Sequence, residues 1–197
     1  MKLYFIRHGE SEHNQALSER GLVSSIPEKR DLPLTDEGIA QIEKILTKLP
    51  DTIDVFYCSD HIRTRQSADI LQKKYPATPY TIDARINASF GGEFDHKSFD
   101  EIKKITGIDF QRAVNDDTFD YRPWGGECAA DVHARVKDFL HDMIVKHEHE
   151  TIIVVGSVES IKSAYHNLFQ KYAPNLVRAL RIKNGTIHEF NITKDMI

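Results

Sequence analysis

Residues 1–14 of the 197-residue chain read MKLYFIRHGESEHN, in which a short apolar run leads directly into an Arg-His-Gly-Glu turn. Residues 3–6 form a nearly continuous apolar segment, which is typical of a strand covered on both faces of a sheet. Gly9 permits a sharp turn behind His8, because glycine accepts backbone conformations that other residues avoid. The stretch therefore predicts a buried strand that presents Arg7 and His8 at its carboxyl end, where open α/β sheets bind ligands.

The side chains of this turn suit an anionic ligand. Arg7 offers a planar fork of N–H donors for phosphate or carboxylate, and Ser11 and Asn14 add neutral donors. His8 has three chemical options, as a nucleophile, a proton carrier or a metal ligand. An arginine beside a histidine is a weak signal by itself, so the rest of the chain has to decide between them.

The composition is that of an ordinary water-soluble globular protein, with 26 basic and 30 acidic residues and a net charge of −4. No apolar run approaches the ~20 residues of a membrane-spanning helix, and the first apolar stretch is too short for the core of a signal peptide. With only two cysteines, we expect a cytoplasmic protein of one domain, residues 1–197. We expect a small-molecule partner and neither nucleic acid nor membrane; a homodimer is left open.

Alternating helical and strand patterns predict an α/β fold, a three-layer sandwich with a mostly parallel central sheet flanked by helices. Further strands are expected at 53–58 and 151–155, and Asn184-Gly185 between ALRIK and TIHEF predicts a C-terminal antiparallel hairpin. Thr35 is expected to cap a helix that ends at Pro50, and Ser59 a helix that starts near His61. The apolar face of the first helix is expected to comprise Ile39, Ile42, Ile45, Leu46 and Leu49.

The region around 83–125 is irregular and is expected to be a cap-like insertion. It contains a predicted capping box from Ser98 to Glu101, before a helix that stops at Gly107. Its aromatic residues suit either a local core or a ligand wall: Phe90, Phe94, Phe119, Tyr121 and Trp124. A long helix follows, with core spacing at Val132, Val136, Phe139, Leu140 and Met143, and a later helix buries Ile161, Ala164 and Leu168.

Five motifs in order resemble the histidine phosphatase superfamily, which includes cofactor-dependent phosphoglycerate mutases and broad-specificity phosphatases. They are RHGESEHN (7–14), PLTDEGIAQ (33–41), SDHIRTRQSA (59–68), GEC (126–128) and VGSV (155–158). The resemblance implies that His8 is the nucleophile and forms a phosphohistidine, while Arg7 and Asn14 hold the phosphate oxygens. It also implies that Arg63, on the first turn of its helix, is a second phosphate clamp.

Two positions depart from the family pattern. Ser157 stands where a second histidine stabilises the phosphoryl group, and Asn87 stands where a glutamate protonates the leaving oxygen. Glu93 and Glu159 are the candidates for a shifted acid. The sequence leaves open which of them acts, if either does, and whether Ser157 is native or an introduced change.

The resulting expectation is a phosphatase that hydrolyses a small phosphomonoester through His8, with Arg7, Arg63, Ser157 and Glu93 as the other catalytic positions. Phosphate binding is assigned to Arg7, Ser11, Asn14 and Arg63. No metal or other cofactor is expected, because no set of ligands with metal spacing converges in the motifs. The alternatives are a mutase-like phosphotransferase and a degenerate member that binds phosphate compounds or a partner without turnover.

Overall fold

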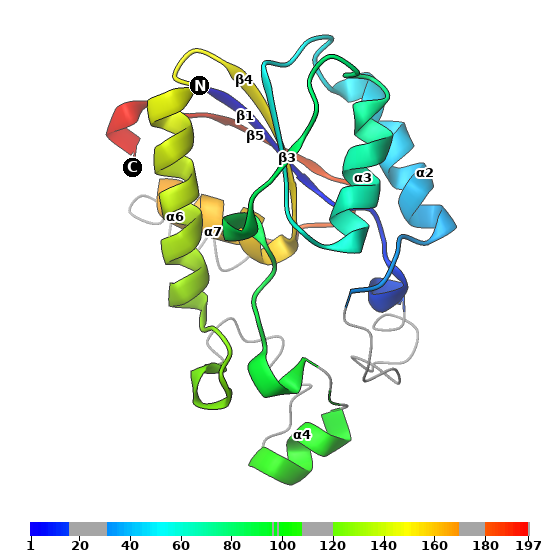
Figure 1. Ribbon diagram of the computed structural model, residues 1–197, viewed down its shortest axis with the longest axis vertical. Helices are drawn as coiled ribbons and strands as arrows, with labels where there is room; N and C mark the ends of the chain where they lie inside the picture. Colours follow the sequence, from blue (N-terminus) through cyan, green and yellow to red (C-terminus); the bar gives the residue numbers. More distant parts are fainter. Residues whose placement is uncertain (16–30, 96, 98, 108–119, 170–179, 197) are drawn as a thin grey trace.

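A five-stranded sheet forms the centre of the computed structural model, which describes residues 1–15, 31–95, 97, 99–107, 120–169 and 180–196 (Figure 1). The strands are β1 (Lys2–Arg7), β2 (Val55–Cys58), β3 (Thr81–Ile82), β4 (Thr151–Gly156) and β5 (Ile187–Asn191). Their order is β3-β2-β4-β1-β5, with every neighbouring pair parallel except β1 and β5. The predicted mostly parallel sheet is therefore confirmed.

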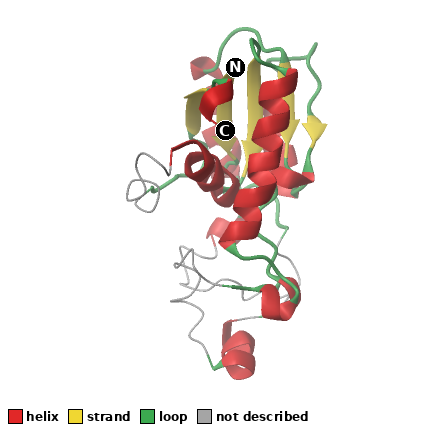
Figure 2. Cartoon of the chain, turned by 90° about the vertical axis from the view of Figure 1, so that its left-hand side faces the viewer, coloured by secondary structure: helices red, strands yellow, loops and turns green. Residues whose placement is uncertain are grey.

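The two faces of the sheet are covered by different helix pairs, as Figures 1 and 2 show. Leu3 and Phe5 of β1 pack with α6 (Ala129–Lys146) and α7 (Val158–Phe169). Tyr4 and Ile6 point the other way, toward α2 (Asp36–Ile45) and α3 (Ile62–Gln72). This alternation follows from the two-residue period of a strand and gives the three-layer sandwich that the sequence predicts.

The helix α2 begins as predicted, because the Thr35 hydroxyl accepts a hydrogen bond from the Gly38 N–H at 3.0 Å. The 3₁₀ turn η1 (Leu46–Lys48) continues it toward Pro50. One predicted core position is wrong, because the side chain of Ile39 is 38% exposed whereas Ile42 is fully buried. The apolar stripe of α2 is narrower than the spacing of its isoleucines indicates.

Two local predictions need correction. The N-cap of α3 is His61 and not Ser59, whose hydroxyl instead donates to the Thr64 hydroxyl at 2.9 Å. The C-terminal antiparallel strand is confirmed as β5, but it pairs with β1 rather than with ALRIK. Residues 180–183 are not a strand, and the carbonyl of Ile182 accepts a hydrogen bond from Arg7. That segment is tied to the end of β1, while Gly185 turns the chain with a φ of +63°.

The predicted cap-like region starts beside α6 and α7, and most of it lies beyond the carboxyl ends of the parallel strands, at the bottom of Figure 1. Its described elements are η2 (Ala84–Ile86), η3 (Gly92–Phe94), α4 (Phe99–Thr106) and η4 (Arg122–Trp124). Phe94 is buried against Trp124, with ring centroids 4.8 Å apart, whereas Phe90 is 54% exposed. As predicted, α4 stops at Gly107, whose φ is +70°.

Ser98 and Phe119 lie outside the described residues. The helices α6 and α7 bury all the apolar positions predicted for them. The chain closes with the 3₁₀ turn η5 (Lys194–Met196). Among the helices that the structure describes, none combines the length and apolar character needed to cross a membrane.

Candidate active site

His8 directly follows β1 and is 3% exposed. Its backbone N–H donates to the Gly156 carbonyl at 3.1 Å, which extends the pairing of β1 with β4 by one residue. The next N–H, of Gly9, donates to the Ser67 hydroxyl of α3 at 3.2 Å. Contacts from β4 and α3 therefore fix the backbone on both sides of the histidine.

The turn behind His8 lies against the start of α2 without room for a side chain. A Cβ on Gly9 would come within 2.2 Å of the Gly38 carbonyl oxygen, and a Cβ on Gly38 within 2.0 Å of the Glu10 carbonyl oxygen. The side-chain oxygen of Gln41 also accepts the Glu10 N–H at 2.9 Å. The second family motif, residues 33–41, thus anchors the turn that carries the candidate nucleophile.

The hydrogen bonds of His8 define its tautomer. Nε2 is 3.2 Å from Nε of Arg63, and a guanidinium can only donate, so Nε2 is the acceptor. The proton of the neutral ring is then on Nδ1, which donates to the Gly9 carbonyl at 2.7 Å. The lone pair of Nε2 is therefore held toward a guanidinium.

The electrostatic environment keeps His8 neutral. Burial lowers the pKa of His8 well below its ordinary value, and the charges of Arg63 and Arg7 lower it further. The Arg7 guanidinium donates to the Ile182 carbonyl, while its buried Nε–H has no acceptor among the described residues. The two arginines and a neutral imidazole therefore form one electropositive group with nucleophilic character.

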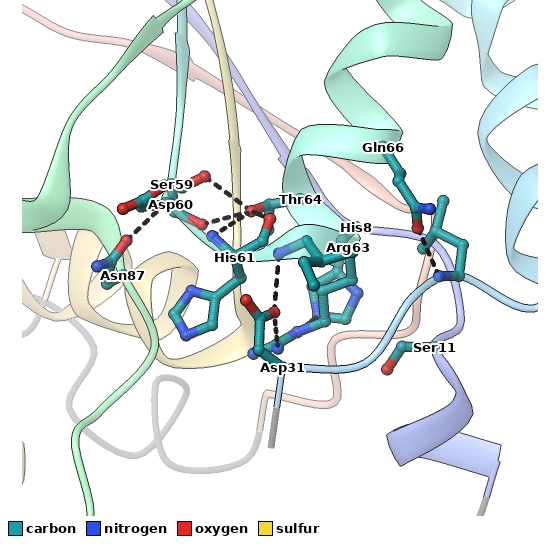
Figure 3. A network of polar contacts seen from close by, with 12 residues as sticks. His8, Ser11, Asp31, Ser59, Asp60, His61, Arg63, Thr64, Gln66 and Asn87 are labelled. Carbon is teal, nitrogen blue, oxygen red and sulfur yellow. Dashed lines mark hydrogen bonds and ion pairs between the residues drawn. The ribbon is translucent and has the colours of Figure 1, made fainter. Parts of the chain in front are cut away.

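Asp31 is the acidic partner of Arg63 (Figure 3). Its carboxylate lies 3.5 Å from Nη1 of Arg63 and also accepts the Ile62 N–H, at the start of α3, at 2.8 Å. A phosphate that approaches Arg63 must displace Asp31 or share the guanidinium with it. No motif in the sequence indicated this residue.

Asn14 reaches the site through Asn184. The side-chain amide of Asn184 donates to the carbonyls of His8 and Gly9 at 3.2 and 3.3 Å, and to Oδ1 of Asn14 at 3.0 Å. The buried Ser11 hydroxyl also donates to that oxygen, at 3.1 Å. Oδ1 of Asn14 is thus engaged by the protein, and Ser11 positions Asn14. The NH₂ group of Asn14 has no acceptor among the described residues and is able to donate to a ligand.

Ser157, at the expected second-histidine position, caps α7. Its hydroxyl accepts the Ser160 N–H at 3.2 Å, and the Ser160 hydroxyl accepts the Ser157 N–H at 2.9 Å. This is a reciprocal capping box, with Ser157 only 2% exposed. The sequence analysis counted Ser157 among the catalytic positions and did not anticipate its structural function.

Glu159, in the first turn of α7, is the carboxylate that interacts with the arginines. Burial alone would raise the pKa of Glu159, but hydrogen bonds from its own backbone and from Ser157, and the charges of Arg63 and Arg7, hold it below the ordinary value. Glu159 is therefore ionised in the free protein. Of the two acids proposed from the sequence, it is the one that the structure places in the field of both arginines.

Glu93 and Asn87 belong to the cap-like region. Glu93 is exposed on η3, and Oδ1 of Asn87 accepts the Asp60 N–H at 2.8 Å (Figure 3). Asn87 is also held through its carbonyl by Arg135, which donates to the carbonyls of residues 85, 87 and 88 and forms a salt bridge with Glu127 at 2.8 Å. Arg135 of α6 therefore fixes the chain around Asn87, and the sequence did not indicate this contact.

Comparison with known proteins places the chain in a family. A profile of the "Histidine phosphatase superfamily (branch 1)" matches residues 3–197. Phosphoserine phosphatase 1 of Hydrogenobacter thermophilus is 28% identical over 167 residues, covering 84% of this chain and 74% of that protein. Phosphoglycerate mutase-like protein 4 of Arabidopsis thaliana is 24% identical over 193 residues, covering 97% and 79%.

Among solved structures, the alpha-ribazole phosphatase of Shigella flexneri has the same fold, with a TM-score of 0.79 at 22% identity. That alignment covers 100% of this chain and 93% of the other. The family match extends over nearly the whole sequence, residues 3–197. The chain therefore belongs to branch 1 of the histidine phosphatase superfamily.

Proposed function

We propose that this protein hydrolyses a small phosphomonoester through a phosphohistidine formed on Nε2 of His8. One observation supports this function above all others. The histidine is buried and neutral, and its Nε2 lone pair faces the Arg63 guanidinium at 3.2 Å. A phosphate whose oxygens take over the Arg63 Nε–H would release this lone pair next to phosphorus, where it can act as the nucleophile.

In the first step, Nε2 attacks phosphorus and the bond from phosphorus to the ester oxygen breaks, so the alcohol leaves with that bond's electron pair. Nδ1 keeps its proton, and the Gly9 carbonyl stabilises the charge that develops on the ring. In the second step, water attacks phosphorus, the P–N bond breaks, and inorganic phosphate and neutral His8 are regenerated. Arg7, Arg63 and the NH₂ group of Asn14 hold the phosphate oxygens in both steps.

We assign the proton transfers to Glu159. It is ionised in the free protein, but a bound phosphate dianion would raise its pKa because like charges oppose ionisation. Glu159 could then deliver a proton to the leaving oxygen and later remove one from the attacking water. General acid catalysis of this kind typically contributes about 10²–10⁴-fold for a poor leaving group.

The test is hydrolysis of an activated aryl phosphate by the wild type and by His8→Ala, in buffer with and without EDTA. Wild-type turnover should persist in EDTA and should be abolished by His8→Ala. Acid quenching of the wild type should trap an acid-labile phosphohistidine. The matched control is His141→Ala, which removes an exposed imidazole on α6 and should leave turnover unchanged. His8→Ala activity at a tenth of wild type or more would place the chemistry on another residue.

A second candidate is a phosphate-binding protein without turnover. One observation favours it: the two residues that depart from the family pattern both make hydrogen bonds that support the fold. Ser157 caps α7, and Asn87 accepts the Asp60 N–H of the adjacent loop. Such a protein would bind phosphate with the wild-type site but yield no phosphohistidine. A phosphotransferase would instead form the phosphohistidine and pass it to an added alcohol faster than to water.

A further inference from the structure

A pocket of about 670 Å³ adjoins the candidate active site on the side of α2. It is lined by Arg7, Gln41, Arg181, Ile182, Lys183 and Asn184. Three of these six residues carry a positive charge and none carries a negative charge, although the whole chain has a net charge of −4. The pocket is therefore an electropositive surface within an acidic protein.

The local backbone explains why these cations gather. Ile182 is 6% exposed, while its neighbours Arg181 and Lys183 are exposed, so the buried isoleucine fixes the segment and both charged side chains lie outside the core. The carbonyl of Ile182 is bonded to Arg7, and Asn184 is bonded to the His8 turn. The segment 181–184 is thus attached to the active site by its own backbone and amide groups.

Arg181 and Lys183 have no carboxylate partner among the described residues, unlike Arg63, Arg65 and Arg85, each of which pairs with an aspartate. Neither side chain contributes to the core. Unpaired cations beside a pocket attract anions and exclude cationic ligands. Fold stability alone therefore gives no reason for this concentration of positive charge.

Arg7 belongs to both regions. It lines the pocket, and its charge also lowers the pKa of His8. Arg7 is therefore the residue through which a ligand with its phosphate at His8 and Arg63 would reach the pocket. Gln41 and Asn184 add neutral polar groups along the same wall.

We propose that this pocket is a subsite for a second anionic group of the substrate, so that the preferred substrate is a phosphomonoester that also carries a carboxylate or a second phosphate. Arg181 and Lys183 bind that group, and Arg7 separates it from the phosphate being transferred. This inference rests on the proposed function for the position of the first phosphate. It adds a specificity determinant outside the five motifs.

The test measures binding by isothermal titration calorimetry to the full chain carrying His8→Ala, which keeps each ligand intact. The ligands are ω-phosphonooxy carboxylates with three, four and five carbons, their matched primary amides, and the corresponding alkanediol bisphosphates. The carboxylates should bind about three- to tenfold more tightly than the amides at the best chain length, as one or two partly exposed charged hydrogen bonds would give. A further gain with the bisphosphate would identify a second phosphate as the preferred group.

Arg181→Gln and Lys183→Gln should each reduce the preference for the carboxylate over the amide, and together abolish it, while the affinity for inorganic phosphate stays unchanged. The control is Lys137→Gln, at an exposed position of α6 on the face of the sheet opposite α2 and Gln41, and it should have no effect. Equal affinity for carboxylate and amide at every length would overturn the proposal. So would the absence of measurable binding, or a preference that survives both glutamine substitutions.

Failure of the proposed function would look different. In that case the wild type would not hydrolyse the amide or the carboxylate ester, whereas His8→Ala would still show the charge preference and its loss in the glutamine variants.

Discussion

Asp31→Asn tests whether an internal carboxylate competes with phosphate for Arg63, the phosphate-binding residue that we propose. The Asp31 carboxylate is 3.5 Å from Nη1 of Arg63, and the two side chains are 40% and 10% exposed. At that distance an effective dielectric constant of about 20 gives roughly 5 kcal/mol of Coulomb energy, which solvent reduces strongly at a partly exposed pair. We therefore take about 1 kcal/mol as the part that phosphate binding must overcome.

The substitution is chosen to remove charge and little else. An asparagine can still accept the Ile62 N–H through Oδ1, so the first turn of α3 keeps this hydrogen bond. If the free energy of binding becomes more favourable by about 1 kcal/mol, the dissociation constant for inorganic phosphate or vanadate should fall about fivefold. Calorimetric titration at fixed ionic strength measures this directly.

Asp60→Asn is the matched control, since it removes an aspartate that pairs with Arg65 at 3.6 Å on the same helix. It changes the net charge of the chain equally but leaves Arg63 alone. If both variants tighten phosphate binding to the same extent, the gain is a general charge effect. If Asp31→Asn leaves the dissociation constant unchanged, Asp31 does not compete with phosphate and the reasoning fails.

Three further predictions concern stability and turnover. Folding lowers the pKa of His8, so as the pH falls His8 is protonated in the unfolded chain before it is protonated in the folded protein. The free energy of unfolding should therefore fall as the pH drops below about 6.5. In urea titrations His8→Ala should reduce this pH dependence. Ser157→His should raise the turnover of an aryl phosphate at least tenfold, although loss of the helix cap should lower the free energy of unfolding by about 1 kcal/mol. Ser157→Ala should lose the same stability with no rise in turnover. A Ser157→His protein that folds and binds phosphate but has no higher turnover would favour the phosphate-binding protein without catalysis. Arg135→Ala should lower the free energy of unfolding by about 2–4 kcal/mol in denaturant titrations. Arg135→Lys should restore less than half of that loss, because a lysine ammonium cannot replace the planar guanidinium that binds Glu127 and three carbonyls. Full recovery of stability in Arg135→Lys would contradict this.

The sequence predicted the features that depend on local pattern. The apolar run of residues 3–6, the Thr35 cap and the buried spacing of α6 each involve residues close together in the chain, and the structure has all three. The motif around His8 also located the candidate site, because a strand end dictates where its next residues project.

The parts that the sequence did not predict depend on contacts between distant segments. Asp31 meets Arg63 across 32 positions, and Asn184 meets Asn14 across 170, so no spacing rule could reveal either contact. Residues 180–183 have the composition of a strand, but the bond from Arg7 to Ile182 and the pairing of β5 with β1 determine their backbone instead. Local propensity yields there to tertiary contacts.

The contact between Gly9 and Gly38 has a consequence for how substitutions combine. Each glycine would place a Cβ within about 2.2 Å of backbone belonging to the other segment, so an alanine at either position forces the same two segments apart. Once one alanine has separated them, the second meets space that already exists. The two substitutions should therefore be strongly non-additive, and a pairwise mutational scan would find them epistatic although 29 positions separate them in the chain.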